Sequence, residues 1–166
     1  AFENNSIKVP FVVPNIELSD KRAIETALKS NLLTDGPILR KFENEFCKFT
    51  GSKYAIGVSN ATSALHLSLK SLGIGKGDEV IIPNITFVAT ANAVLYVDAT
   101  PVLVDVNDHD INISIKSIEK SITKKTKAII PVHFAGKSCD MLAIQKIAKK
   151  NNLKIIEDCA HALGTK

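Results

Sequence analysis

The sequence is poor in cysteine and lacks long apolar runs. Its three cysteines are an odd number without Cys-x-x-Cys spacing, which argues against a disulfide framework or a structural zinc site and favours a reducing compartment. Its apolar stretches all fall short of the roughly 18 residues that a membrane-crossing helix needs. The N-terminus also lacks a basic segment followed by a long apolar run, so no signal peptide is visible. We therefore expect a soluble, cytoplasmic protein with no membrane partner.

The sequence also lacks a dense basic stripe interleaved with aromatic residues. The net charge is +4, but the lysines are spread along expected helices and in turns such as Lys120–Lys127. This spread is typical of solvated faces rather than of nucleic-acid binding. The chain is otherwise ordinary for a globular protein, with 166 residues of which 45% are apolar and 23% charged. This length fits one domain or a large part of one.

Proline and glycine mark the ends of the first predicted elements. Two prolines among the first fifteen residues predict an irregular N-terminal arm over residues 1–18. Ser19 is the expected N-cap of a first helix. Pro37 suits the first position of a second helix, and Gly51 can close that helix in the left-handed conformation.

From residue 54 onward the sequence alternates between short apolar runs and helical patterns. We expect strands over 54–59, 79–83, 101–106, 127–132 and 154–157, and helices over 61–73, 87–97, 114–122 and 140–151. The expected strands are continuous apolar runs, as in a parallel sheet covered by helices on both faces. The sequence therefore predicts an α/β fold of three layers with a mostly parallel sheet. In such folds, ligands bind outside the carboxyl ends of the strands.

Three features that could bind a ligand follow expected strands. Ser59, Thr62 and Ser63 lie where a helix begins, and such a helix start can bind a phosphate or simply be capped. Phe87, after the second strand, could stack on a flat ligand or fill the core. Asp158, after the last strand, is a carboxylate in an apolar sheet and needs a positive or proton-donating partner.

Pyridoxal phosphate would use all three features. It needs a phosphate cup at a helix N-terminus, a side chain against its ring and an acid at its pyridine nitrogen. A zinc site of His133, Asp158, Cys159 and His161 is the weaker alternative, because the Cys-x-His pair has no matching second half at ligand spacing. His133 alone is better explained as a hydrogen-bonded structural residue. We therefore expect no metal site.

The arrangement of these segments resembles a known family. The matching segments are "LLTDGPILRKFENEF", "YAIGVSNATSALHLSLKSLGIGKGDEVIIPNITFVATANAVLY", "PVLVDV", "TKAIIPVHFAG" and "IIEDCAHALG". In order and spacing they resemble the N-terminal part of the DegT/DnrJ/EryC1/StrS family, the pyridoxal-phosphate-dependent sugar aminotransferases. The resemblance implies a fold-type-I aminotransferase large domain over residues 19–166. It also implies that the rest of that domain and a C-terminal small domain are absent from this sequence.

The resemblance implies roles for individual residues. It implies cofactor contacts by Ala61 and Thr62 at the phosphate, Phe87 on the ring, Asp158 at the pyridine nitrogen and His161 nearby. Thr34 and Asp35 correspond to a loop that borders the sugar site. The implied reaction moves an amino group from glutamate to a nucleotide-linked keto-sugar, and the implied assembly is a homodimer.

The resemblance also implies that a part of the machinery is missing. In the family, the lysine that holds the cofactor as a Schiff base lies further along the chain than Lys166. We therefore expect no catalytic residue in this chain and no transamination by it. Three alternatives remain open: a sugar dehydratase with histidine in place of that lysine, a non-catalytic cofactor-binding regulatory protein, and an α/β binding domain without a cofactor.

Overall fold

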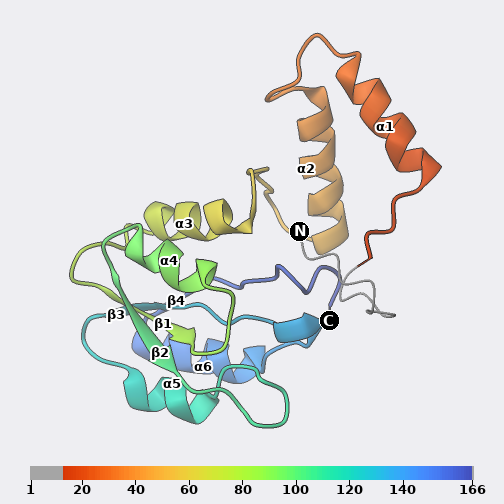
Figure 1. The fold of residues 1–166 in the computed structure, drawn as a ribbon. Coiled ribbons are helices and arrows are strands. Elements are labelled where there is room, and N and C mark those ends of the chain that lie inside the picture. The colour runs from red at the N-terminus through yellow and green to blue at the C-terminus, as the bar shows by residue number, and fades with distance from the viewer. Residues whose placement is uncertain (1–12, 166) are drawn as a thin grey trace, which may run out of the picture. The chain divides into compact units, whose positions relative to one another are not determined.

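The computed structural model describes residues 13–165 (Figure 1). The chain forms two compact units, which divide after Gly57. The first unit holds helices α1, Leu18–Leu28, and α2, Pro37–Thr50. The domain boundary predicted between residues 18 and 19 stays a prediction, and residues 1–12 of the predicted arm lie outside the described residues.

The helix ends of the first unit are partly as predicted. Gly36 precedes Pro37 at the start of α2, and Gly51 ends this helix at a φ of 72°, as its sequence predicted. The prediction for Ser19 was wrong, because the N-cap of α1 is Glu17. The carboxylate of Asp20 accepts a hydrogen bond of 2.9 Å from the Glu17 backbone N–H. This bond satisfies a free donor at the helix start and fixes the start before Ser19.

The strand predicted over residues 54–59 is absent from the described structure. This stretch is extended but makes no strand ladder, and the side chains of Tyr54 and Ile56 are 74% and 81% exposed. Its best-defined contact is a hydrogen bond of 2.7 Å from the Gly57 N–H to a Glu43 carboxylate oxygen. The prediction failed because a strand is defined by a pairing partner, which an apolar run does not supply by itself.

The second unit is a four-stranded parallel sheet with helices on both faces. Its strands are β1 (Glu79–Pro83), β2 (Thr100–Val104), β3 (Thr126–Ile129) and β4 (Lys154–Ile155). Its helices are α3 (Ala61–Ser71), α4 (Ala89–Leu95), α5 (Ile115–Ser121), α6 (Met141–Asn151) and the short 3-10 helix η1 (Phe134–Gly136). Within residues 13–165, the structure has no helix with the length and apolar character to cross a membrane.

Successive strand residues face two different cores. Val80 and Ile82 pack with residues of α3 and α4, whereas Ile81 packs with residues of α5 and α6. Figure 1 shows these helix pairs on opposite faces of the sheet. Because helices cover both faces, most positions within the strands are apolar, and the polar residues Glu79, Thr100 and Lys154 stand at strand starts. This explains the continuous apolar runs in the sequence. The predicted three-layer α/β fold is confirmed.

The order of the strands indicates where this sheet would bind a ligand. The order is β2-β1-β3-β4, and all pairs are parallel. The chain moves from β1 to β2 on one side and then to β3 on the other side of β1, so the order changes direction between β1 and β3. Ligands of open α/β sheets bind beyond the carboxyl ends of strands at such a point.

Candidate functional site

The backbone holds Asp158 firmly at the carboxyl edge of the sheet. Pairing between β3 and β4 continues past their ends as a parallel bridge between Val132 and Asp158. The Asp158 N–H donates to the Pro131 carbonyl at 2.9 Å, and the His133 N–H donates to the Asp158 carbonyl at 3.2 Å. The Asp158 residue is 9% exposed. The predicted acid is therefore fixed in a largely buried position.

Each carboxylate oxygen of Asp158 accepts one hydrogen bond. The Thr90 hydroxyl donates to Oδ2 at 3.2 Å, and the Ala160 N–H donates to Oδ1 at 3.1 Å. An ionised carboxylate has about four acceptor positions. Two of these remain for a further donor, which is the chemistry that a protonated ring nitrogen requires.

Phe87 lies in the segment that joins β1 to α4. Its side chain is 74% exposed. Of the two roles that the sequence allowed, this exposure excludes a place in the hydrophobic core. Its backbone carbonyl accepts a hydrogen bond of 3.1 Å from the Thr90 N–H. Phe87 and Asp158 are thus both bonded to Thr90, which links the predicted ring-stacking residue to the predicted acid.

The start of α3 carries the predicted phosphate residues. The Asn60 side chain caps the helix by accepting a hydrogen bond of 2.8 Å from the Ser63 N–H. The N–H groups of Ala61 and Thr62 lie in the first turn of the helix. N–H groups in a first turn have no carbonyl of the same helix to donate to. The first turn of α3, residues 61–64, contains no acidic residue in the sequence. Both N–H groups therefore have the polarity to attract an anion.

His161 and the two predicted sugar-site residues are exposed. The His161 ring lies edge-on to the Phe134 ring, with centroids 6.4 Å apart. A Cβ on Gly136 would lie 3.1 Å from the His161 carbonyl oxygen, so the two segments approach closely. Thr34 and Asp35 lie between α1 and α2 in the first unit. Their role at a sugar site stays a prediction.

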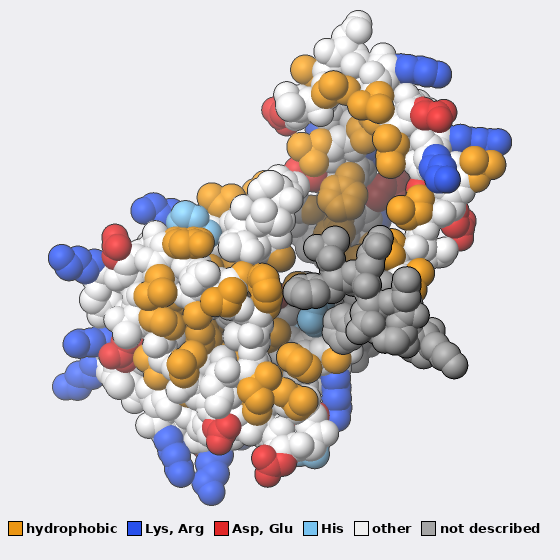
Figure 2. Space-filling model, viewed as in Figure 1, with side chains coloured by type: hydrophobic (Ala, Val, Ile, Leu, Met, Phe, Trp, Pro, Cys, Tyr) orange, Lys and Arg blue, Asp and Glu red, His pale blue; other side chains and the backbone are white. Residues whose placement is uncertain are grey.

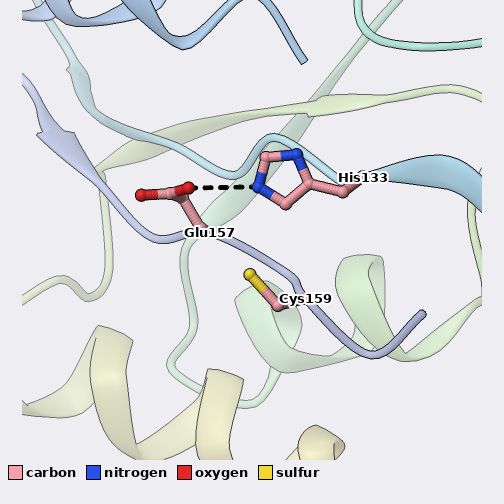
Figure 3. A group of neighbouring side chains, drawn as sticks. All are labelled: His133, Glu157 and Cys159. Atoms are coloured by element: carbon pink, nitrogen blue, oxygen red, sulfur yellow. Dashed lines mark hydrogen bonds and ion pairs between the residues drawn. The ribbon is translucent and has the colours of Figure 1, made fainter. Parts of the chain in front are cut away.

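His133, Glu157 and Cys159 form a cluster (Figure 3), and two of them flank Asp158 in the sequence. Their potential ligand atoms lie within 4.8 Å of one another. His133 Nε2 is 3.1 Å from a Glu157 carboxylate oxygen, and His133 Nδ1 accepts a hydrogen bond of 3.0 Å from the Cys139 N–H. Because Nδ1 accepts, the neutral ring carries its proton on Nε2 and donates it to Glu157.

This tautomer argues against a metal at the cluster. A metal at Nε2 would move the ring proton to Nδ1, where it would face the Cys139 N–H. Burial and the charges of Glu157 and Asp158 also raise the pKa of Cys159 above its ordinary value, which disfavours the thiolate that metals bind. We therefore interpret His133 as a structural residue, as its position in the sequence suggested.

Thr90 and the pairing of His133 with Glu157 were not predicted from the sequence. A signal for Thr90 was present, because it is a hydroxyl residue within an otherwise mostly apolar helical run, and such a residue needs a hydrogen-bond partner when buried. Nothing in the spacing connected it to Asp158, which lies 68 residues away. Only the fold shows this contact.

Comparison with known proteins identifies the family. Residues 14–166 match the DegT/DnrJ/EryC1/StrS aminotransferase family. The chain belongs to this family. The spore coat polysaccharide biosynthesis protein SpsC of Bacillus subtilis is 43% identical over 157 residues, which cover 95% of this chain and 40% of SpsC. The prediction of the family from its motifs is thus confirmed.

Solved structures confirm the aminotransferase fold. The aminotransferase from Psychrobacter cryohalolentis is 44% identical, with a TM-score of 0.89, over 93% of this chain and 40% of its own. NtdA from Bacillus subtilis, solved with bound cofactor PMP, is 38% identical, with a TM-score of 0.84, over 90% of this chain and 35% of its own. The chain therefore spans 35–40% of the length of these relatives.

The residues of the site fit the pyridoxal cofactor that the family implies. Asp158 is a fixed acid with unused acceptor positions, Phe87 has a free ring face, and the first turn of α3 offers N–H groups without a nearby acidic residue in that turn. These are the three kinds of group that such a cofactor requires. All three belong to the second unit.

Proposed function

We propose that this chain is the N-terminal part of a pyridoxal-phosphate-dependent aminotransferase. In this proposal the enzyme moves an amino group from glutamate to a nucleotide-linked keto-sugar, acts in polysaccharide or amino-sugar biosynthesis, works as a homodimer and is cytoplasmic. The observation that carries the proposal is Asp158, a largely buried carboxylate with unused acceptor positions at the carboxyl edge of a parallel sheet. Family membership supports the reaction class.

Each proposed contact follows from the chemistry of the residues. When bound, the cofactor supplies an electron sink for the carbanion that forms at the substrate Cα. Asp158 holds a proton at the ring nitrogen, because an ionised carboxylate favours a positive partner. The first-turn N–H groups of α3 hold the phosphate, and Phe87 covers one face of the ring. His161 lies beside the ring, and Thr34 and Asp35 contact the sugar.

The proton-transferring lysine is proposed to lie outside these 166 residues. The relatives are more than twice as long as the part that this chain matches. We therefore expect the 166-residue chain alone not to transaminate. The full-length protein that contains it is expected to be active.

An exposed apolar surface supports the proposed homodimer. The segment from residue 85 to residue 96 carries five large hydrophobic side chains that are 44–74% exposed: Ile85, Phe87, Val88, Leu95 and Tyr96. Figure 2 shows hydrophobic atoms gathered at the surface around α4. Such a surface is typical of a protein interface. Light scattering on the full-length protein should therefore give the mass of a dimer.

The experiment is an assay of the full-length protein with pyridoxal phosphate, glutamate and a panel of nucleotide keto-sugars. We expect 2-oxoglutarate and an amino-sugar product in equal amounts. Asp158→Asn should abolish the reaction, whereas Asp108→Asn, at an exposed acid, should leave it unchanged. A product that has lost a hydroxyl without gaining nitrogen would instead indicate the dehydratase, and indifference to Asp158→Asn would contradict the proposal.

A further inference from the structure

Thr90 is a buried hydroxyl whose hydrogen bonds differ from those of other helical threonines. Thr26 and Thr50 donate their hydroxyl protons to carbonyls four residues earlier in their own helices, both at 2.8 Å. Thr90 is 0% exposed and donates instead to Asp158, 68 residues away. Its hydroxyl is therefore directed to the proposed cofactor acid rather than to its own helix.

A second threonine orders the protons of this contact. The hydroxyl oxygens of Thr86 and Thr90 are 2.8 Å apart. A threonine hydroxyl has one proton to donate. Because Thr90 uses its proton for Asp158, Thr86 must donate to the Thr90 oxygen. The chain of donors therefore runs from Thr86 through Thr90 to Asp158 Oδ2.

The threonine hydroxyls donate to one carboxylate oxygen of Asp158, and a backbone N–H donates to the other. Asp158 Oδ1 accepts from the Ala160 N–H, two residues further along the chain. With one bond on each oxygen, the rotation of the carboxylate about its Cβ–Cγ bond is fixed. Hydrogen bonds in such a chain also polarise one another. An acid held in this way presents the same lone pairs to every bound ring.

We infer that Thr90 is a positioning residue for the proposed cofactor: its hydroxyl, supported by Thr86, sets the orientation in which Asp158 meets the ring nitrogen. This inference rests on the proposed function. The alternative is that Thr90 only ties α4 to the sheet edge. The two roles differ in one respect, because only a positioning role depends on the presence of a nitrogen in the ring.

The test compares two ligands on the full-length protein. One is pyridoxal phosphate, and the other is its analogue with carbon in place of the ring nitrogen. The measured quantity is the ratio of their dissociation constants, determined by equilibrium dialysis. Both ligands keep the aldehyde and the phosphate, so a general loss of structure weakens both equally and leaves the ratio unchanged.

The variants are Thr90→Val, Thr90→Ser, Thr86→Val and Asp158→Asn. Thr90→Val keeps the shape without the hydroxyl and should reduce the preference for pyridoxal phosphate roughly tenfold. Thr90→Ser restores the hydroxyl and should keep the preference. Thr86→Val should reduce the preference by a smaller factor, about threefold. If Thr90→Val does not fold, the result for Thr86→Val tests the inference.

The outcomes separate this inference from the proposed function. If Asp158→Asn removes the preference but Thr90→Val and Thr86→Val keep it, Thr90 is structural and the inference is overturned, while the proposed function stands. If Asp158→Asn itself keeps the full preference, the role proposed for Asp158 fails and the inference fails with it. Equal weakening of both ligands by Thr90→Val also overturns the inference.

Discussion

Asn112 is a buried amide that connects its own segment to residues 134–138 of the second unit. It is 2% exposed. Its Oδ1 accepts from the Phe134 N–H at 3.2 Å, and its Nδ2 donates to the carbonyls of Lys137 and Ser138, both at 3.1 Å. Residues 134–138 include Gly136, which approaches the His161 backbone. Asn112 therefore supports the segment against which the candidate site is built.

Replacing Asn112 should destabilise the fold. Asn112→Ala leaves the Phe134 N–H and two carbonyls without their side-chain partner, and an unsatisfied buried group typically costs 1–3 kcal/mol. We expect the free energy of unfolding to fall by about 3 kcal/mol in urea denaturation. Asn151→Ala, at an exposed position in the last turn of α6, is the matched control. A loss below about 0.5 kcal/mol for Asn112→Ala would contradict this account.

The thiols should react with a pH dependence set by their surroundings. Burial raises the pKa of the Cys139 thiol to about 11. Partial burial and the negative charges of Glu157 and Asp158 raise the pKa of the Cys159 thiol, although part of this residue remains accessible to solvent. Because only the thiolate reacts, alkylation of exposed Cys159 should keep accelerating as pH rises beyond 9.0, the ordinary thiol value.

Alkylation by iodoacetamide, read by mass spectrometry from pH 7 to 10, checks the prediction. Cys139 is only 5% exposed, so it should react only after unfolding. The protein unfolded in urea, where the thiols are free, is the control. A Cys159 rate that reaches its plateau below pH 9.0, the ordinary thiol value, would show that its pKa is not raised.

Single residues were predicted correctly where the type of residue and its place in the local sequence were sufficient. The sequence placed Asp158 at a strand end, and the structure puts it there with its side chain largely buried. It could not connect Thr90 to Asp158, because a contact across 68 residues depends on how α4 packs on the sheet. The order of hydroxyl protons through Thr86 likewise exists only in three dimensions.

At the scale of elements, α3 ends in a closed hydrogen-bond motif. Gly73 has a φ of 71°. Its N–H donates to the Lys70 carbonyl at 3.1 Å, and the Ile74 N–H donates to the Leu69 carbonyl at 3.2 Å. This double pattern is the Schellman motif, in which the left-handed residue is usually glycine. Leu69 and Ile74 also share a core cluster.

Two neighbouring glycines offer a matched test of this motif. Gly73→Ala should lower the free energy of unfolding by about 1 kcal/mol or slightly more, because a Cβ is unfavourable at positive φ. Gly75→Ala should have little effect, because Gly75 is outside the left-handed region and its new Cβ would lie 3.5 Å from the nearest atom. Thermal unfolding of both variants checks the difference. Equal losses would mean that φ is not the cause.

Helix ends were predictable where a few adjacent residues set them, except at the start of α1, where the N-cap is Glu17 rather than Ser19. The ends at Gly51 and Gly73 and the Pro37 start match the structure, and the helix predicted from residue 114 has Ser114 as its N-cap, since each depends on a few adjacent residues. The strand predicted over 54–59 did not form, because its pairing partner is not encoded nearby. In the second unit the strand predictions held, since helices on both faces hold the sheet together.

At the scale of the whole molecule, the two units differ in how much they bury. None of the residues of α1 or α2 is buried, whereas the second unit contains two clusters of buried apolar side chains. Short helices without a buried face are marginal in water. Among residues 13–165, only those of the second unit have the packing that stabilises a fold by itself.

Separate expression of the two units tests this difference. Residues 58–166 should keep their helix and strand signals in circular dichroism and unfold cooperatively. A peptide of residues 13–57 should show much less helix than α1 and α2 span, because isolated helices of this length rarely persist. Full helicity in that peptide would contradict the prediction, as would a disordered spectrum from residues 58–166.

The parallel order of the sheet has a consequence for how the site assembles during synthesis. β1, β2 and β3 are complete in the chain before β4 is made, and Thr86 and Thr90 leave the ribosome well before Asp158. Chains emerge N-terminus first, so the donors are in place when the acid arrives. We expect Asp158 to find its hydrogen-bond donor already present when it packs at the carboxyl edge of the sheet. Its charge would then not be buried without a hydrogen-bond partner at any stage of folding.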